Sequence, residues 1–134
     1  MKEFSLQIVT PDKTAFDGKA TSLLIRTAAG DVEILAGHAD LLCALGTGRA
    51  RIRFADGGER FTGASGGFLS VSEGTVRVAA TTFEFADELD LDRAEAAKEK
   101  AEQRIKNAKS RAELDLAKAK LQRALTRIQV KTMK

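Results

Sequence analysis

Hydrophobic and polar positions alternate through most of the first 86 residues. Residues 4–9, FSLQIV, and residues 49–55, RARIRFA, place apolar side chains at every second position. This period of two is typical of β-strands with one buried face. The turn signals TPDK, AAGD, ADGG and SEGT separate such stretches at short intervals. Together they predict about eight to ten short strands, arranged as an antiparallel β-sandwich or a flattened barrel.

The period changes to that of α-helices after ELDLDRA, residues 88–94, whose carboxylates suit a helix N-terminus. The first apolar stripe consists of Ala94, Ala97, Ala101, Ile105 and Ala108, and the second of Leu114, Ala117, Leu121, Ala124 and Ile128. Between them, Ser110 and Glu113 have the spacing of a capping box that starts a new helix. We therefore expect an α+β chain: a sandwich over residues 1–86 and an antiparallel two-helix hairpin over residues 87–134.

The first stripe is mostly alanine, which limits how strongly the two helices hold each other. Burial stabilises by about 25 cal/mol per Å² of apolar surface, so methyl groups contribute far less than Leu or Ile side chains. The sequence predicts a stable β domain and a helical hairpin that opens at modest cost. An ordinary close-packed helix pair is an equal alternative from the sequence alone.

Composition is that of a soluble folded protein, with 43% hydrophobic and 31% charged residues. No apolar run approaches the roughly 20 residues that cross a bilayer, and the alternating N-terminus does not resemble a signal peptide. The single cysteine, Cys43, lies in the apolar stretch LLCAL, where we expect a buried, inert thiol. These features favour a reducing cytosolic compartment.

Charge is distributed unevenly along the chain. Residues 1–86 carry 9 basic and 10 acidic side chains, residues 87–103 carry 3 and 7, and residues 104–134 carry 10 and 2. The last segment therefore has a net charge of +8. It is expected to pair with the acidic segment before it or with an acidic partner elsewhere.

Few side chains are suited to catalysis. The chain has one histidine, His38, one cysteine and no tyrosine or tryptophan, so neither a His/Cys metal site nor a Ser/His/Asp set is expected. GASGG, residues 63–67, lacks the Lys and Ser/Thr of a phosphate-binding loop and indicates a tight turn or bulge beside Phe68. The arginines within residues 49–53 are interpreted as the solvated face of one strand.

A cluster of arginines is the strongest candidate for a binding site. In a hairpin that turns near residue 109, Arg93 lies opposite about residue 125, so Arg123 and Arg127 flank it from one face of the second helix. Converging guanidinium groups repel unless an anion compensates them. Physical reasoning favours the nearby carboxylates of Asp90, Asp92 and Glu95, paired as surface salt bridges. A nucleotide phosphate is the alternative.

Three stretches in this order, GDVEILAGHADLL, SGGFLSV and LDLDRAEAAKEKAE, resemble the epsilon subunit of the F-type rotary ATP synthase. The resemblance covers essentially the whole chain. It implies a non-catalytic rotor subunit whose β-sandwich contacts the gamma subunit and the membrane rotor ring. It also implies a C-terminal hairpin that regulates ATP hydrolysis, and a location at the cytoplasmic face of the cell membrane without insertion into the bilayer. No cofactor is required.

Some bacterial members of this family bind ATP on the folded hairpin, with or without magnesium. The resemblance implies a site formed by Glu84, Leu89, Asp90, Arg93, Ala94, Lys100, Arg123 and Arg127. Lys100 stands where a well-known ATP-binding pattern has arginine, so the charge is kept but the bidentate fork is lost. The rotor-contact loop is implied at Asp31 and His38, although both prolines and one glycine of the usual pattern are replaced there.

These features lead to one mechanistic expectation and one alternative. The hairpin is expected to fold against the β domain when ATP binds and to extend toward the catalytic-head subunits otherwise, where its basic second helix inhibits hydrolysis. The alternative is a nucleic-acid-binding module that uses the basic tail. That tail lacks aromatic residues to stack on bases, and we therefore expect no nucleic-acid partner.

Overall fold

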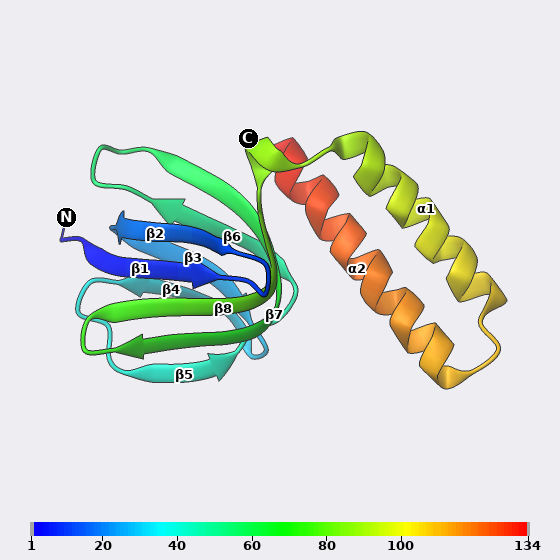
Figure 1. Ribbon diagram of the computed structural model, residues 1–134, viewed down its shortest axis with the longest axis horizontal. Helices are drawn as coiled ribbons and strands as arrows, with labels where there is room; N and C mark the ends of the chain where they lie inside the picture. The colour runs from blue at the N-terminus through cyan, green and yellow to red at the C-terminus, as the bar shows by residue number, and fades with distance from the viewer. Residues whose placement is uncertain (1, 134) are drawn as a thin grey trace.

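A computed structural model describes residues 2–133 and consists of a β-sandwich followed by two antiparallel helices (Figure 1). Met1 and Lys134, the outer ends of the two predicted domains, lie outside the described residues. The strands are β1 (Phe4–Val9), β2 (Thr14–Ala20), β3 (Ser22–Thr27), β4 (Gly30–Leu35), β5 (Leu41–Ala44), β6 (Gly48–Arg53), β7 (Glu59–Ser72) and β8 (Thr75–Phe85). They are followed by a 3-10 turn, η1 (Ala86–Glu88), and by α1 (Leu91–Asn107) and α2 (Arg111–Met133).

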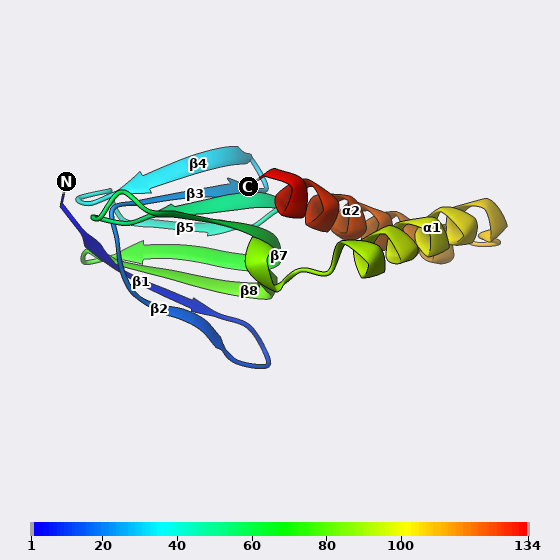
Figure 2. The same ribbon diagram turned by 90° about the horizontal axis from the view of Figure 1, so that it is seen from above.

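The strands form one hydrogen-bonded sheet that curls into two facing layers, which confirms the predicted sandwich (Figure 2). The order is β2-β1-β8-β7-β6-β3-β4, and β5 pairs with β7. Between residues 2 and 133 the strand pairings are antiparallel except that of β1 with β8, which runs from Ser5↔Thr75 to Val9↔Ala79. A parallel pair joins segments far apart in the sequence, so the alternating pattern alone could not indicate it.

The predicted turn signals all fall between consecutive antiparallel strands. TPDK joins β1 to β2, AAGD joins β3 to β4, ADGG joins β6 to β7, and SEGT joins β7 to β8. At the last of these, Glu73 and Gly74 have φ values of 51° and 79°. A two-residue turn with positive φ at both positions matches the twist of the strands that it connects.

The GASGG stretch is not a turn between strands, because β7 continues through it for 14 residues. Gly66 and Gly67 have φ values of 68° and 95°, and the strand bends there. One edge of β7 pairs with β6 before the bend and with β5 after it, while β8 follows the other edge throughout. The two glycines therefore produce a bend that carries β7 from one neighbour to the next.

The core lies between the two layers and is built from the inward-facing positions of the alternating strands. Its fully buried members include Leu6, Ile8, Leu23, Ile25, Ile34, Ile52, Leu69 and Val78. Cys43, expected to be buried, is only half-buried and packs against this core. Its strand, β5, is short and lies outside the main strand order, which leaves the thiol partly uncovered.

Both helices begin as the sequence predicts. Asp90 is the N-cap of α1, and its carboxylate accepts a hydrogen bond from the Arg93 N–H at 3.2 Å. The Ser110 hydroxyl accepts from the Glu113 N–H at 3.1 Å, while the Glu113 carboxylate accepts from the Lys109 N–H at 2.9 Å. The capping box thus reaches one residue further back than its usual pattern. No helix within residues 2–133 has the length and apolarity to span a membrane.

The bend in β7 generates a stability prediction. A Cβ atom at Gly67 would lie against the Ala79 carbonyl oxygen, closer than any real contact, whereas one at Gly57, φ +90°, would meet nothing within 4 Å. Gly57→Ala should cost about 1–2 kcal/mol for its backbone conformation alone. Gly67→Ala should cost at least about 3 kcal/mol because the β7–β8 backbone must also shift. Denaturant unfolding measures the free energy of unfolding of both variants. Equal losses of stability would contradict the close approach of the β8 backbone to Gly67.

Candidate functional site

The hairpin rests on the sandwich through the C-terminal half of α2. Val130 is fully buried and forms a small apolar cluster with Ala86, Leu89 and Phe61. Gly63 on β7 lies directly beneath α2, because a Cβ atom there would be in van der Waals contact with the Thr126 and Val130 side chains. Figure 1 shows α1 on the far side of α2 from the sheet. The hairpin is therefore attached to the sandwich mainly by one helix.

Two polar contacts accompany this apolar cluster. The Arg127 Nε donates to a Glu84 carboxylate oxygen on β8 at 2.6 Å, and both side chains are about one third exposed. The Lys131 ammonium donates to the Ala86 carbonyl oxygen at 3.2 Å, at the start of η1. These bonds tie α2 to the end of the last strand and to the connection that leads into α1.

The connection itself is held from the sandwich side by Arg60. Its guanidinium lies 3.5 Å from the centroid of the Phe85 ring and 3.3 Å from the Asp87 carboxylate. Stacking on an aromatic ring and pairing with a carboxylate together suit arginine better than lysine. Arg60 thus fixes the chain where it leaves β8 and enters η1.

A hollow of about 240 Å³ lies where α1, α2 and the end of β8 meet. Its lining residues are Glu84, Glu88, Leu89, Asp90, Arg93, Ala94, Ala97 and Arg127. They include three carboxylates, two guanidinium groups and an apolar wall. This mixed surface can accept both hydrogen-bonding and apolar parts of a small molecule.

A second hollow of about 360 Å³ adjoins the first and shares Ala97 and Arg127 with it. It lies between the two helices, and its other lining residues are Lys100, Ala101, Arg104, Lys120 and Arg123. Five of its lining side chains are cationic and none is acidic. Such a surface favours an anion with several charges.

The structure assembles every residue of the predicted nucleotide site around these two hollows. The first contains Glu84, Leu89, Asp90, Arg93, Ala94 and Arg127, and the second contains Lys100, Arg123 and again Arg127. Arg93 and Arg127 thus line one hollow together, whereas Arg123 faces the next. Arg104 and Lys120 also line the second hollow and were not predicted, although each stands at helical spacing from a predicted cation, four residues after Lys100 and three before Arg123.

The expected local salt bridges are not formed. Within residues 2–133, no ion pair joins the three arginines to Asp90, Asp92 or Glu95. The Asp90 carboxylate caps α1 instead, and the anionic partner of Arg127 is Glu84, 43 residues away in the sequence. Only docking of α2 on the sandwich brings this pair together, so local spacing could not reveal it.

Asp31 and His38 lie at opposite ends of β4 and do not form one site. Asp31 accepts a hydrogen bond from the Arg26 Nε at 2.6 Å, and this bond holds the pKa of the Asp31 carboxyl below its usual value. His38 lies in the loop after β4, where its Nδ1 is 2.7 Å from the Ala39 carbonyl oxygen. Figure 2 shows β4 running away from the hairpin, so His38 lies at the end of the sandwich remote from α1 and α2.

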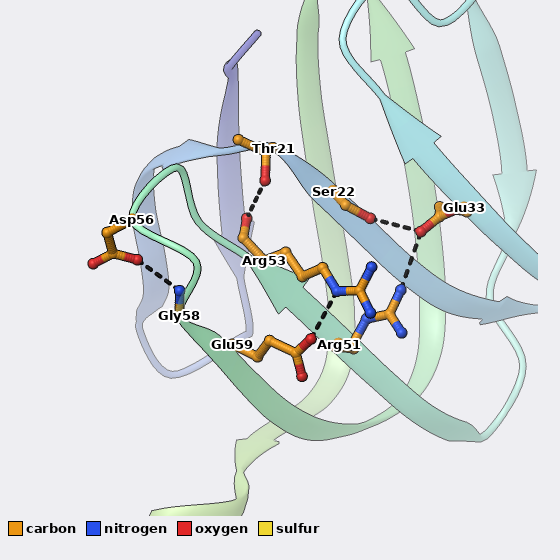
Figure 3. Close-up of polar contacts among 8 residues, drawn as sticks. All are labelled: Thr21, Ser22, Glu33, Arg51, Arg53, Asp56, Gly58 and Glu59. Carbon is orange, nitrogen blue, oxygen red and sulfur yellow. Dashed lines mark hydrogen bonds and ion pairs between the residues drawn. The ribbon is translucent and has the colours of Figure 1, made fainter. Parts of the chain in front are cut away.

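The arginines of β6 form a separate network on the outside of the sandwich (Figure 3). Arg53 pairs with Glu59 at 2.8 Å, and Arg51 pairs with Glu33 at 3.0 Å, which also accepts from the Ser22 hydroxyl. The Arg51 side chain is only 19% exposed. The face is therefore polar and largely exposed, as predicted, and its ion pairs also cross-link β4, β6 and β7.

Comparison with known proteins adds family relationships to this geometry. Residues 3–86 match the family model described as ATP synthase, Delta/Epsilon chain, beta-sandwich domain, and residues 87–132 match the corresponding long alpha-helix domain. The ATP synthase epsilon chain of Ruminococcus albus is 40% identical, with 100% of both chains covered. That of Exiguobacterium sp. is 36% identical, with 100% of this chain and 99% of the relative covered.

Solved structures share the fold. A chain in the Euglena gracilis mitochondrial ATP synthase, OSCP/F1/c-ring assembly, superimposes with a TM-score of 0.81 and 21% identity over 92% of this chain and 78% of that chain. A chain of the Tetrahymena thermophila mitochondrial ATP synthase, central stalk/c-ring, gives a TM-score of 0.63 and 19% identity over 98% of each. At these identities the likeness establishes the fold alone.

The small docking contact generates a second prediction. Val130→Ala removes two methylene equivalents from the apolar cluster and should weaken docking of the hairpin by about 1–2 kcal/mol. Amide hydrogen exchange should then show lower protection in α2 and unchanged protection in the strands. The control is Leu116→Ala on the same helix, because that side chain is 55% exposed. Equal loss of protection in strands and helices would show that the two parts unfold together.

Proposed function

The chain belongs to the ATP synthase delta/epsilon chain family, and we propose that it acts in the central stalk as a non-catalytic subunit that regulates ATP hydrolysis. In this proposal the sandwich, residues 1–86, binds the gamma subunit and the membrane rotor ring, and the hairpin, residues 87–134, is the regulatory part. Full-length similarity to epsilon chains at up to 40% identity supports this assignment. The assembly would hold the subunit at the cytoplasmic face of the cell membrane.

The regulatory ligand in this proposal is ATP, bound where the hairpin meets the sandwich. The observation that carries it is the pair of adjoining hollows, one lined by charges of both signs and one whose charged side chains are all cationic. A nucleotide has the same division, since its base and ribose are uncharged and its phosphates carry several negative charges. Phosphates therefore belong in the second hollow, beside Lys100 and Arg123, and the base and ribose in the first, beside Leu89 and Ala94.

The position of the His38 loop supports a contact with the rotor ring at one end of the sandwich. The loop that carries His38 lies at the end of the sandwich opposite the hairpin, so the sandwich would contact the ring with one end while its other end supports the helices. Asp31 is at the other end of β4 and already paired with Arg26. We therefore assign the ring contact to the His38 loop and not to Asp31.

Binding of ATP would regulate hydrolysis because the site exists only when the hairpin is folded on the sandwich. Its walls come from α1, α2 and β8, and separation of any one of them removes part of the lining. A ligand that binds one state only shifts the equilibrium toward that state by an amount set by its concentration and affinity. Without ligand, the extended hairpin would present its basic second helix to acidic surface on the catalytic-head subunits and slow hydrolysis.

Titration calorimetry on the isolated chain tests the nucleotide site. ATP should bind the natural chain, and Arg93→Gln should weaken binding on the order of tenfold by removing one charge-assisted contact. Lys100→Arg should strengthen binding, because a guanidinium offers two parallel donors to one phosphate. Arg111→Gln is the matched control, since Arg111 is 85% exposed at the start of α2. No heat at millimolar ATP would refute the site.

Removal of the hairpin tests the regulatory role. A chain truncated after Asp87 retains the complete core of the sandwich and should still join the assembly. We expect ATP hydrolysis by the assembled enzyme to rise severalfold at low ATP, where the natural hairpin is extended. The full-length chain in the same assembly is the reference, with equal incorporation checked by co-purification. Unchanged hydrolysis with equal incorporation would exclude a regulatory hairpin.

A further inference from the structure

The cations of the second hollow lack the partners that surface charges usually have. Arg127 is paired with Glu84, but Lys100, Arg104, Lys120 and Arg123 form no ion pair or hydrogen bond within the described part of the chain. Like charges gathered between two helices repel each other. The alanine-lined helix contact nearby, with Ala101 and Ala124 buried, offsets this repulsion only weakly. The folded hairpin therefore gains most from an anion that neutralises several charges at once.

The charges follow one another along the helices, away from the sandwich. On α2 the order is Arg127, Arg123 and Lys120, and on α1 it is Arg93, Lys100 and Arg104. Seven residues of helix span about 10 Å, so Arg127 and Lys120 are separated by roughly that distance along α2. Arg127 borders both hollows, whereas Lys120 lines only the second. A phosphate chain that starts beside Arg127 therefore meets successive cations, and Lys120 comes last.

We propose that Lys120 contacts the terminal phosphate of a nucleoside triphosphate and gives the site its preference for triphosphates over diphosphates. This inference rests on the proposed nucleotide site and specifies which ligands it distinguishes. A diphosphate ends before the last pair of cations and leaves Lys120 and Arg104 uncompensated. Lys120 is half-buried and lines the hollow between α1 and α2.

The test compares Lys120→Gln with Lys118→Gln. Both variants lose one positive charge from α2, and Lys and Gln have similar helix propensity, so fold and net charge stay matched. Lys118 is exposed and lines neither hollow. Titration calorimetry on the full chain with ATP, ADP and inorganic tripolyphosphate gives the affinities. Lys120→Gln should lower the affinity for ATP and for tripolyphosphate on the order of tenfold, and the affinity for ADP by less than about threefold. Lys118→Gln should change the affinity for each ligand by less than about twofold.

Other outcomes separate this inference from the proposed function. If Lys120→Gln lowers the affinities for ATP and ADP equally, Lys120 attracts phosphates without distinguishing the terminal one. That result would overturn the inference and leave the nucleotide site intact. The same holds if Lys118→Gln and Lys120→Gln behave alike. If the natural chain binds tripolyphosphate but not ATP, the nucleotide function and this inference both fail, because the inference requires a nucleoside triphosphate. If it binds neither, both are refuted.

Discussion

The arrangement of the two parts of the molecule depends on one small apolar contact. Among the side chains that the structure describes, Val130 meets Ala86, Leu89 and Phe61 in the one apolar cluster that joins the hairpin to the sandwich. The sandwich has a core of its own from residues 4–85, whereas α1 packs mainly on α2 through alanines. The sandwich is therefore expected to be more stable than the hairpin. A contact of this size is compatible with a hairpin that can leave the sandwich without disturbing it.

Charge and packing act against each other in the hairpin. The alanine seam lets α1 and α2 approach closely, and this closeness brings Lys100, Arg104, Lys120 and Arg123 around one hollow. Larger apolar side chains would bind the helices more firmly and hold the cations further apart. The same small residues thus weaken the hairpin and concentrate its positive charge. In the proposed switch, the ligand supplies the attraction that the packing does not.

Local patterns in the sequence were enough for the elements but not for their long-range relations. Alternation, turn signals and the caps at Asp90 and Ser110 are set by neighbouring residues, and the structure confirms them. The parallel pairing of β1 and the Glu84–Arg127 bond depend on segments far apart in the chain. For the candidate site, helical spacing predicted that Arg93, Arg123 and Arg127 approach one another, and the structure places them around two adjoining hollows. The same spacing gave the wrong counter-ions, because docking and not sequence proximity selects them.

The position of β1 has a consequence for the order in which the chain can fold during synthesis. The first strand leaves the ribosome early, yet its neighbour on one side, β8, is translated about 70 residues later. Until then β1 has only β2 to pair with, and an isolated two-stranded hairpin is marginally stable at best. The sandwich can close only when residues 75–79 have emerged, just before the helices follow. The newly made helical hairpin thus docks on a sandwich that has closed only shortly before.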